Sequence, residues 1–167
     1  GNSFFTSQIF NCEVGIDLND MPNTTIISGL YIANCDRGIE CDNSDLTLNN
    51  STIESTSIHG LLINGNTTNV QIISSNFSFC PIGIRAFDVR DLTVESNTSF
   101  FGNSTDIFRR GLPNDYTLVN DCTFDGALTA NFFTNMFPGV SKIQNSSLGS
   151  IFGGIGNGGN VIAFGLG

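Results

Sequence analysis

The sequence predicts an all-β protein in which one chain winds into a single-stranded parallel β-helix. This solenoid has about 22–23 residues per turn and roughly 6–7 turns, where a turn means one full coil of the chain. Three observations predict it: a phrase repeated at a fixed spacing, apolar residues at every second position, and the lack of any segment with a convincing helical period.

The repeated phrase comes first. NCEVGIDL, residues 11–18, returns as NCDRGIEC, residues 34–41. The glycine of this segment, which we use as the anchor for alignment, recurs at spacings of 23, 22, 23 and 23, with an aspartate in the fifth unit. The anchors are Gly15, Gly38, Gly60, Gly83 and Asp106. An apolar residue follows each anchor directly: Ile16, Ile39, Leu61, Ile84 and Ile107. Two positions later stand Leu18, Cys41, Ile63, Ala86 and Arg109. Five aligned units predict stacked turns, and the arginine predicts a distorted or shifted fifth turn.

The spacing of apolar residues within each unit is two. GIDL, DLTL, NVQI, DLTV and DYTL alternate inward and outward, which is typical of strands. A second strand of each turn is expected at Leu46–Leu48, Val70–Ile72, Leu92–Val94 and Tyr116–Leu118. A third is expected around Leu30–Ile32, Phe77–Phe79, Phe100 and Phe124. Asn, Ser, Gly and Asp fill the corners between strands, and successive turns should lie about 4.8 Å apart.

Each constant position of the phrase has a structural role in such a stack. Glycine is expected at a corner that a side chain would obstruct, isoleucine in the core, and cysteine as a small apolar filler. Asn11 and Asn34, and at a different corner Asn50 and Asn120, are expected to stack their amides along the solenoid axis.

In this repeat pattern the chain resembles the right-handed parallel β-helix proteins of the pectin-lyase-like superfamily. The resemblance covers residues 8 to about 126 and implies a right-handed coil. The superfamily includes both polysaccharide-cleaving enzymes and non-enzymatic adhesins, spikes and surface proteins, so the resemblance does not decide activity. We expect regular turns over residues 1–126. Residues 127–167, with VSKIQNSSL as a further strand and then a Gly-rich segment, are expected to form irregular final turns of the same domain.

Charge and composition exclude some functions. The net charge of −9 argues against nucleic-acid binding and against an anionic membrane surface, but it permits cations and neutral sugars. No run of 18 apolar residues occurs, so no membrane insertion is expected. Eight sequons predict a glycosylated protein that is secreted or surface-exposed (extracellular or on a virion), although an Asn- and Ser-rich solenoid inflates such a count. They are Asn23, Asn49, Asn50, Asn66, Asn76, Asn97, Asn103 and Asn145.

The five cysteines allow two interpretations. Cys12, Cys35 and Cys80 share one column of the repeat, while Cys41 and Cys122 lie elsewhere. Buried free thiols are the favoured interpretation, because stacked side chains place their Cβ atoms slightly too far apart for a bond. A Cys12–Cys35 disulfide is the alternative, since the Cα spacing of adjacent turns suits one. No cysteine pair has the spacing of a zinc site.

An acidic cluster lies in the first two turns. Asp17 and Glu40 should be outward-facing neighbours, with Asp20, Asp42 and Asp45 in the loops that follow. Hard oxygen ligands suit calcium, so Asp17, Glu40 and Asp42 are a candidate Ca²⁺ site, the single cofactor considered. The resemblance implies the same ion, because pectate lyases of the superfamily use calcium with an arginine base. A solvated acidic face is the alternative.

No catalytic constellation is recognisable, so we do not expect an enzyme. His59, the single histidine, lies in SIHGLLI and faintly resembles the Gly-His-Gly segment of polygalacturonases, but their other three motifs are missing. Its counterparts in other turns are Val14, Arg37, Ile82 and Thr105, which indicates a variable loop position. Asp88 and Asp91 near Arg90 could serve as acid and base, but surface salt bridges are the simpler interpretation.

The expected function is therefore a structural or adhesive surface protein, a subunit or segment of a filament, appendage or spike. Neither end shows an obvious capping helix, so the ends are expected to be covered by other chains or by the rest of a longer protein. Other chains are the expected partners, through end-to-end or lateral self-association. Exposed amides and aromatic residues such as Tyr31, Phe87 and Phe108 would also allow contact with carbohydrate. The alternative is a polysaccharide lyase or glycoside hydrolase of the β-helix type.

Overall fold

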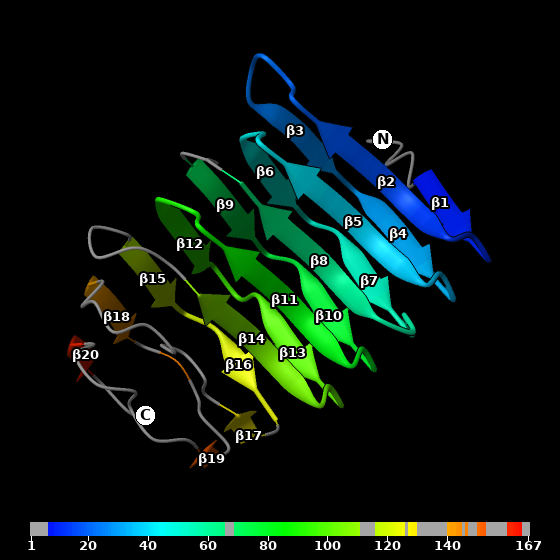
Figure 1. Cartoon of the computed structure of the whole chain (residues 1–167). Helices are drawn as coiled ribbons and strands as arrows, with labels where there is room; N and C mark the ends of the chain where they lie inside the picture. The colour runs from blue at the N-terminus through cyan, green and yellow to red at the C-terminus, as the bar shows by residue number, and fades with distance from the viewer. Residues whose placement is uncertain are drawn as a thin grey trace, which may run out of the picture.

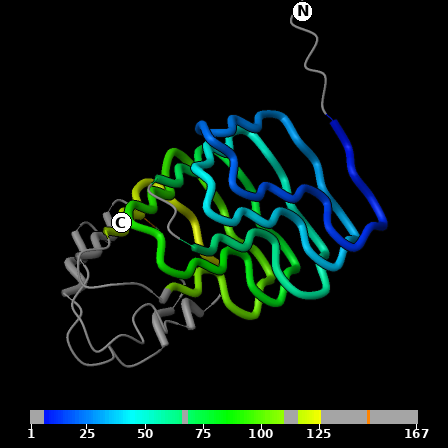
Figure 2. Tube along the Cα trace, turned by 45° about the horizontal axis from the view of Figure 1, so that its top comes forward, coloured from blue at the N-terminus to red at the C-terminus, as the bar shows by residue number. Residues whose placement is uncertain are grey.

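The computed structural model describes residues 7–65, 69–110, 116–125, 127–129, 140–144, 146, 150–152 and 160–164. In this part of the chain the regular elements are strands, and the strands of successive turns pair in parallel (Figure 1). Figure 2 shows the trace winding round the same axis turn after turn. The predicted all-β parallel solenoid is confirmed. The described residues form about five turns, fewer than the six to seven predicted. Each of these turns provides one strand of the five-stranded sheet.

Each of the five turns contributes one strand to each of three sheets, and sheets A and C contain further strands beyond the fifth turn. Sheet A contains β1 (Ser7–Phe10), β4 (Leu30–Ala33), β7 (Thr52–Glu54), β10 (Asn76–Ser78), β13 (Ser99–Phe101) and β16 (Thr123–Phe124). Sheet B contains β2 (Val14–Asn19), β5 (Arg37–Asp42), β8 (His59–Asn64), β11 (Ile82–Phe87) and β14 (Thr105–Arg110). Sheet C contains β3 (Thr25–Ser28), β6 (Leu46–Asn49), β9 (Asn69–Ile73), β12 (Asp91–Glu95), β15 (Tyr116–Asn120), β18 (Val140–Gln144) and β20 (Asn160–Phe164).

The predicted ladder of aliphatic side chains forms the core. Ile39 pairs with Leu61, Leu61 with Ile84, and Ile84 with Ile107, and all four side chains are 0% exposed. Because each turn covers its neighbour, burial accumulates along the axis, and a single turn would not be stable alone.

Glycine in the repeated phrase lies inside a strand, so its predicted place at a corner is wrong. Gly15, Gly38, Gly60 and Gly83 belong to the strands of sheet B. A Cβ atom on Gly38 would lie 2.3 Å from the carbonyl oxygen of Gly60 and 2.7 Å from Cγ2 of Ile53. The column therefore needs glycine because successive turns approach closely there.

The corners use a different device, a residue with positive φ. The described residues in this conformation fall mainly into three columns, one at each corner. They are Asn11, Asn34, Ser55, Phe79 and Gly102 after sheet A; Asp20, Asn43, Gly65 and Asp88 after sheet B; and Gly29, Asn50, Ser74, Ser96 and Asp121 after sheet C. Asn tolerates this region better than most residues, which accounts for its recurrence at positions 11 and 34. The amide stacking stays a prediction.

Two expectations about the fifth turn are wrong. Arg109 lies in the core column opposite Ala86, and β11 and β14 keep their register, so the turn is not distorted. The buried Arg109 guanidinium instead donates a hydrogen bond to the carbonyl oxygen of Val89. In the DYTL segment, Thr117 pairs with Leu92 and is buried, which places Tyr116 on the outer face. A slip of one residue reverses which side chains face inward.

Parallel pairing continues after residue 126. β18 pairs with β15, and β20 with β18, so VSKIQ is the further strand that was predicted. A small separate sheet joins β17 (Ala127–Thr129) to β19 (Ser150–Phe152). In the described part of the chain, no helix is long and apolar enough to cross a membrane.

Candidate functional site

Among the described residues, the first turn of the solenoid is covered by another turn on one side only. β1, β2 and β3 are the outermost strands of sheets A, B and C, and no described strand pairs with their outer edges (Figure 1). The inward-facing side chains of this first turn, Ile9, Ile16 and Ile27, pack against the core but are only partly buried. Their register partners one turn further on are Ile32, Ile39 and Leu48, and each of these is 0% exposed.

Uncapped ends stay a prediction, and sequence reasoning did not identify the partly exposed side chains of the first described turn. The alternating pattern cannot distinguish a first turn from an internal one, because both carry the same apolar ladder. The signal lies in the register: Ile9, Ile16 and Ile27 have a partner on one side only among the described residues. An open parallel edge with apolar side chains behind it favours addition of another strand.

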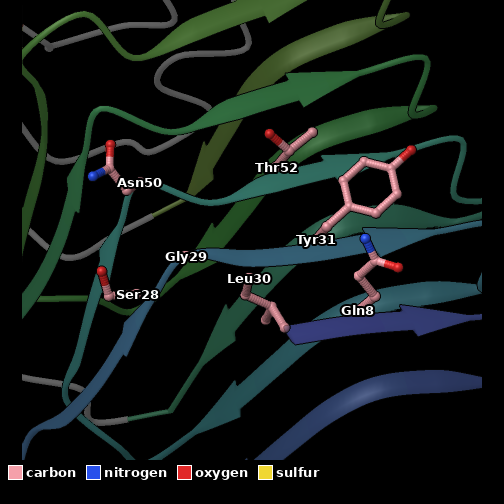
Figure 3. Close-up of a pocket in the computed structure, with 7 residues that line it drawn as sticks. All are labelled: Gln8, Ser28, Gly29, Leu30, Tyr31, Asn50 and Thr52. Carbon is pink, nitrogen blue, oxygen red and sulfur yellow. The ribbon is translucent and has the colours of Figure 1, made fainter. Parts of the chain in front are cut away.

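A shallow pocket opens beside this end, on the outer face of sheet A. It has a volume of about 440 Å³ and is lined by Gln8, Ser28, Gly29, Leu30, Tyr31, Asn50 and Thr52 (Figure 3). Gln8, Tyr31 and Thr52 form one column across the neighbouring strands β1, β4 and β7. None of the lining side chains is charged, so the pocket offers amides, hydroxyls and one aromatic ring.

Tyr31 is held in place from two sides. Its hydroxyl donates a short hydrogen bond to the Glu54 carboxylate, and its ring meets that of Phe10 edge to face at 5.4 Å between centroids. The hydrogen bond to Glu54 raises the pKa of Tyr31, because it favours the protonated phenol. A fixed aromatic ring next to uncharged polar groups is suited to contact with a sugar.

Two exposed phenylalanines lie further along the same face. Phe79 and Phe101 meet edge to face with centroids 5.3 Å apart, and each is more than half exposed. Phe79 also has a φ of 53°, which is uncommon for a bulky residue. The sequence placed Phe79 in a strand, and its corner position explains why its ring faces outward.

Sheet B carries a charged network centred on Arg37. Its guanidinium donates to Glu13 at 2.6 Å and to both oxygens of Glu40 at 3.2 Å. Glu40 also lies 3.6 Å from Nε2 of His59. The loop position predicted for His59 is wrong, because the residue is buried within β8. Burial lowers the pKa of His59, so the imidazole is neutral at pH 7 and helps to pack the network.

The candidate calcium ligands are partly brought together. Asp17 and Glu40 are register partners, as predicted, while Asp42 pairs with Asn19. Among the described residues, no three His, Cys, Asp or Glu side chains converge closely enough to hold a metal ion. Glu40 is engaged by Arg37 instead. The calcium site therefore stays a prediction.

Arg85 and Arg90 lie in the later turns, where the sequence offered an acid–base grouping. Arg85 stacks over the ring of Phe87, with its guanidinium carbon 4.9 Å from the centroid, and lies 6.0 Å from that of Phe108. No ion pair joins Arg90 to Asp88 or Asp91 in the described structure, so the predicted salt bridges there are wrong.

Asp106 ends the glycine column and is fully buried. Its Oδ1 accepts a hydrogen bond of 3.0 Å from Asn103 Nδ2, while Oδ2 has no partner among the described residues. Burial raises the pKa of Asp106 from 3.8 to about 6, because desolvation disfavours the carboxylate.

A pH-dependent penalty is expected at this residue. The pKa of Asp106 is higher in the folded state than in the unfolded state, so its contribution to stability is most favourable below about pH 4. The free energy of unfolding falls by up to about 3 kcal/mol as the pH rises past 6. Asp106→Asn removes the charge and can keep the bond to Asn103. Urea unfolding at pH values from 4 to 7 should show that the variant gains stability relative to the wild type as the pH rises. A constant difference in unfolding free energy across this pH range would contradict the prediction.

The sequon asparagines differ in accessibility. Asn23, Asn50 and Asn97 are exposed. A glycan on Asn103 would replace one of the two N–H groups of Nδ2, which donate to Phe77 O and Asp106 Oδ1, while Oδ1 could still accept from Cys80 N. Asn49 and Asn76 are half-buried, and Asn66 and Asn145 lie outside the described residues. Glycosylation stays a prediction.

Four of the five cysteines are buried thiols, and Cys12 is half-buried. Burial raises the pKa of both Cys41 and Cys122 to about 12, so these thiols remain protonated and unreactive at neutral pH. Cys12 and Cys35 differ from the others, because their sulfur atoms lie 2.7 Å apart.

Compared with known proteins, the chain matches no family model, no curated protein and no solved structure.

Proposed function

We propose that this chain is a structural or adhesive protein of an extracellular or virion surface, a subunit or segment of a larger assembly that forms by end-to-end association. The partial exposure of the inward-facing side chains of the first turn, which has a neighbour on one side only among the described residues, supports the proposal. In this proposal the chain corresponds to the non-enzymatic adhesins and spikes of the pectin-lyase-like superfamily, with a right-handed coil.

A second copy of the chain fits this end because its strands have the same spacing and the same three-sheet arrangement. Strands spaced about 4.8 Å apart in three sheets would extend the three open edges of β1, β2 and β3 together. The half-exposed side chains of Ile9, Ile16 and Ile27 would then be covered as Ile32, Ile39 and Leu48 are. Contact between two different ends is heterologous, and such contacts build open filaments.

Two neighbouring residues of β3 provide the test. Ile27 faces the core cross-section and is half-buried, whereas Ile26 is 73% exposed on the lateral face of sheet C. Ile27→Lys places a charge that remains hydrated in the monomer but would be buried in an end-to-end pair. We expect the wild type to associate as its concentration rises, the Ile27→Lys variant to remain monomeric, and Ile26→Lys to associate like the wild type.

Light scattering coupled to size-exclusion chromatography measures this difference. Circular dichroism on the same samples establishes that both variants are folded. Loss of association in Ile26→Lys alone would indicate lateral contact. A wild type that is monomeric at every concentration would contradict self-association.

The surface location is supported by the exposed sequons Asn23, Asn50 and Asn97 and by the polar, weakly charged outer faces. Neutral carbohydrate is the second proposed partner, and the uncharged pocket around the fixed ring of Tyr31 favours it. A glycan array probed with the protein is the matching experiment, and an array without any bound glycan would remove this candidate.

A polysaccharide lyase or glycoside hydrolase is the alternative function. The buried His59 and the Glu40 carboxylate, which accepts hydrogen bonds from Arg37, give it little support. Incubation with pectin or alginate, followed by absorbance of unsaturated products, tests for lyase activity.

A further inference from the structure

Cys12 and Cys35 are held opposite each other on adjacent turns. Cys12 lies between β1 and β2, and Cys35 occupies the same place between β4 and β5. Two backbone hydrogen bonds fix the register there, from Asp36 N to Cys12 O at 3.0 Å and from Arg37 N to Glu13 O at 2.9 Å. The sulfur atoms meet at 2.7 Å.

The other three cysteines have no such neighbour. Cys41 donates to the carbonyl oxygen of Ser44 at 3.1 Å, Cys80 to that of Ser78 at 3.3 Å, and Cys122 to that of Val94 at 3.3 Å. Ser57 takes the cysteine position on the turn after Cys35, so the column contains a single adjacent cysteine pair among the described residues.

We propose that Cys12 and Cys35 form a disulfide that clamps the first turn of the solenoid to the second. This modification does not depend on the proposed assembly. A disulfide bond is about 2.05 Å long, so the two sulfur atoms need to approach by only a fraction of an ångström. The stacked side chains incline toward each other enough to overcome the Cβ separation that the sequence suggested.

A low-molecular-weight disulfide such as oxidised glutathione supplies the oxidant. The Cys12 thiolate attacks one sulfur of that disulfide, forms a mixed disulfide and releases one thiolate, which takes up the proton lost by Cys12. Cys35 then attacks the Cys12 sulfur and expels the second thiolate, which takes up the proton of Cys35. The two cysteines are oxidised together by two electrons, and one small disulfide is reduced to two thiols.

The order of these steps follows from accessibility. Cys12 is half-buried at the open end, whereas Cys35 is buried beneath the first turn. Hydrogen bonding to Cys35, burial, and the nearby negative charge of Asp36 raise the pKa of Cys12 to about 11. Exchange is therefore slow at neutral pH and accelerates as the pH rises toward 11, because the thiolate is the attacking species.

The clamp acts where the fold has least support. The first turn has a neighbour on one side only among the described residues, and the bond closes a loop of about 23 residues. Such a loop restricts the unfolded chain enough to raise the melting temperature by about 5–10 °C.

The test compares the full chain after equilibration with oxidised glutathione and after reduction with dithiothreitol. Alkylation of the unfolded protein should count all five thiols in the reduced sample and two fewer in the oxidised one. A glutamate-specific protease cuts after Glu13, between the two cysteines, so the Cys12 and Cys35 peptides should remain joined until reduction. The oxidised wild type should melt about 5–10 °C above the reduced one.

The variants Cys12→Ser and Cys35→Ala should each abolish the linked peptide and the redox-dependent difference in melting temperature. Cys80→Ser, in the same column but without an adjacent thiol, should keep both. Five alkylated thiols in both samples, or a glutathione adduct on Cys12 that Cys35 does not displace at pH 9, would overturn the proposal.

Discussion

Replacing Gly38 by alanine should destabilise the protein by at least about 3 kcal/mol, because the new methyl group has no space. It would lie 2.3 Å from the carbonyl oxygen of Gly60 and 2.7 Å from Ile53 Cγ2. The first contact is with backbone, which cannot move without separating β5 from β8. For a chain of this size, the melting temperature should fall by roughly 10 °C.

Gly29 provides the matched control for this substitution. It lies at a corner with a φ of 67°, in the column that contains Asn50 one turn further on. Because asparagine tolerates positive φ, Gly29→Asn should cost less than about 1 kcal/mol. Urea unfolding of both variants measures the difference. Equal costs would contradict the close approach of successive turns at Gly38.

Replacing Phe100 by alanine should cost about 4 kcal/mol, the range expected for removal of a buried aromatic side chain. Phe100 lies between the parallel rings of Phe77 and Phe124, with centroids 5.5 Å and 4.8 Å away. Removal of the middle ring leaves a cavity between two turns, and the strands on either side are fixed by their hydrogen bonds. The loss therefore includes both the burial of Phe100 and its contacts with two neighbours.

The adjacent residue again provides the control. Phe101 is 52% exposed and contacts Phe79 at its edge, so Phe101→Ala should cost under about 1 kcal/mol. The two variants remove the same group from neighbouring positions, and only the direction of the side chain differs. Thermal unfolding that gave both variants the same cost would show that β13 does not alternate between core and solvent.

Much of the fold could be predicted because the repeat itself records the stacking. The column from Ile39 to Ile107 was visible as a spacing of 22 and 23 residues, and burial requires the same kind of residue at each step. The alternating pattern did not show which of two possible registers places its residues in the core. DYTL contains the correct alternation, but Thr117 takes the inward position, and the hydroxyl in the core has no signature in a single sequence.

The candidate surfaces were less predictable because they depend on which side chains meet across turns. Arg37 is joined to Glu13, 24 positions away, and a charge pair at that distance is invisible until the register is known. The surroundings of His59 depend on the same register, which places Glu40 of the preceding turn beside it. The partial exposure of Ile9, Ile16 and Ile27 could not be predicted either, because the apolar pattern is the same with and without a covering turn.

Methyl–methyl nuclear Overhauser effects along the core ladder test the solenoid most directly. The protein is expected to show contacts from Ile39 to Leu61, from Leu61 to Ile84 and from Ile84 to Ile107, because these residues are register partners on adjacent turns. It should show none from Ile39 to Ile84, which lie two turns apart, about 9.6 Å along the axis. A ladder in which Ile39 contacts neither Leu61 nor any other residue of the next turn would contradict the fold.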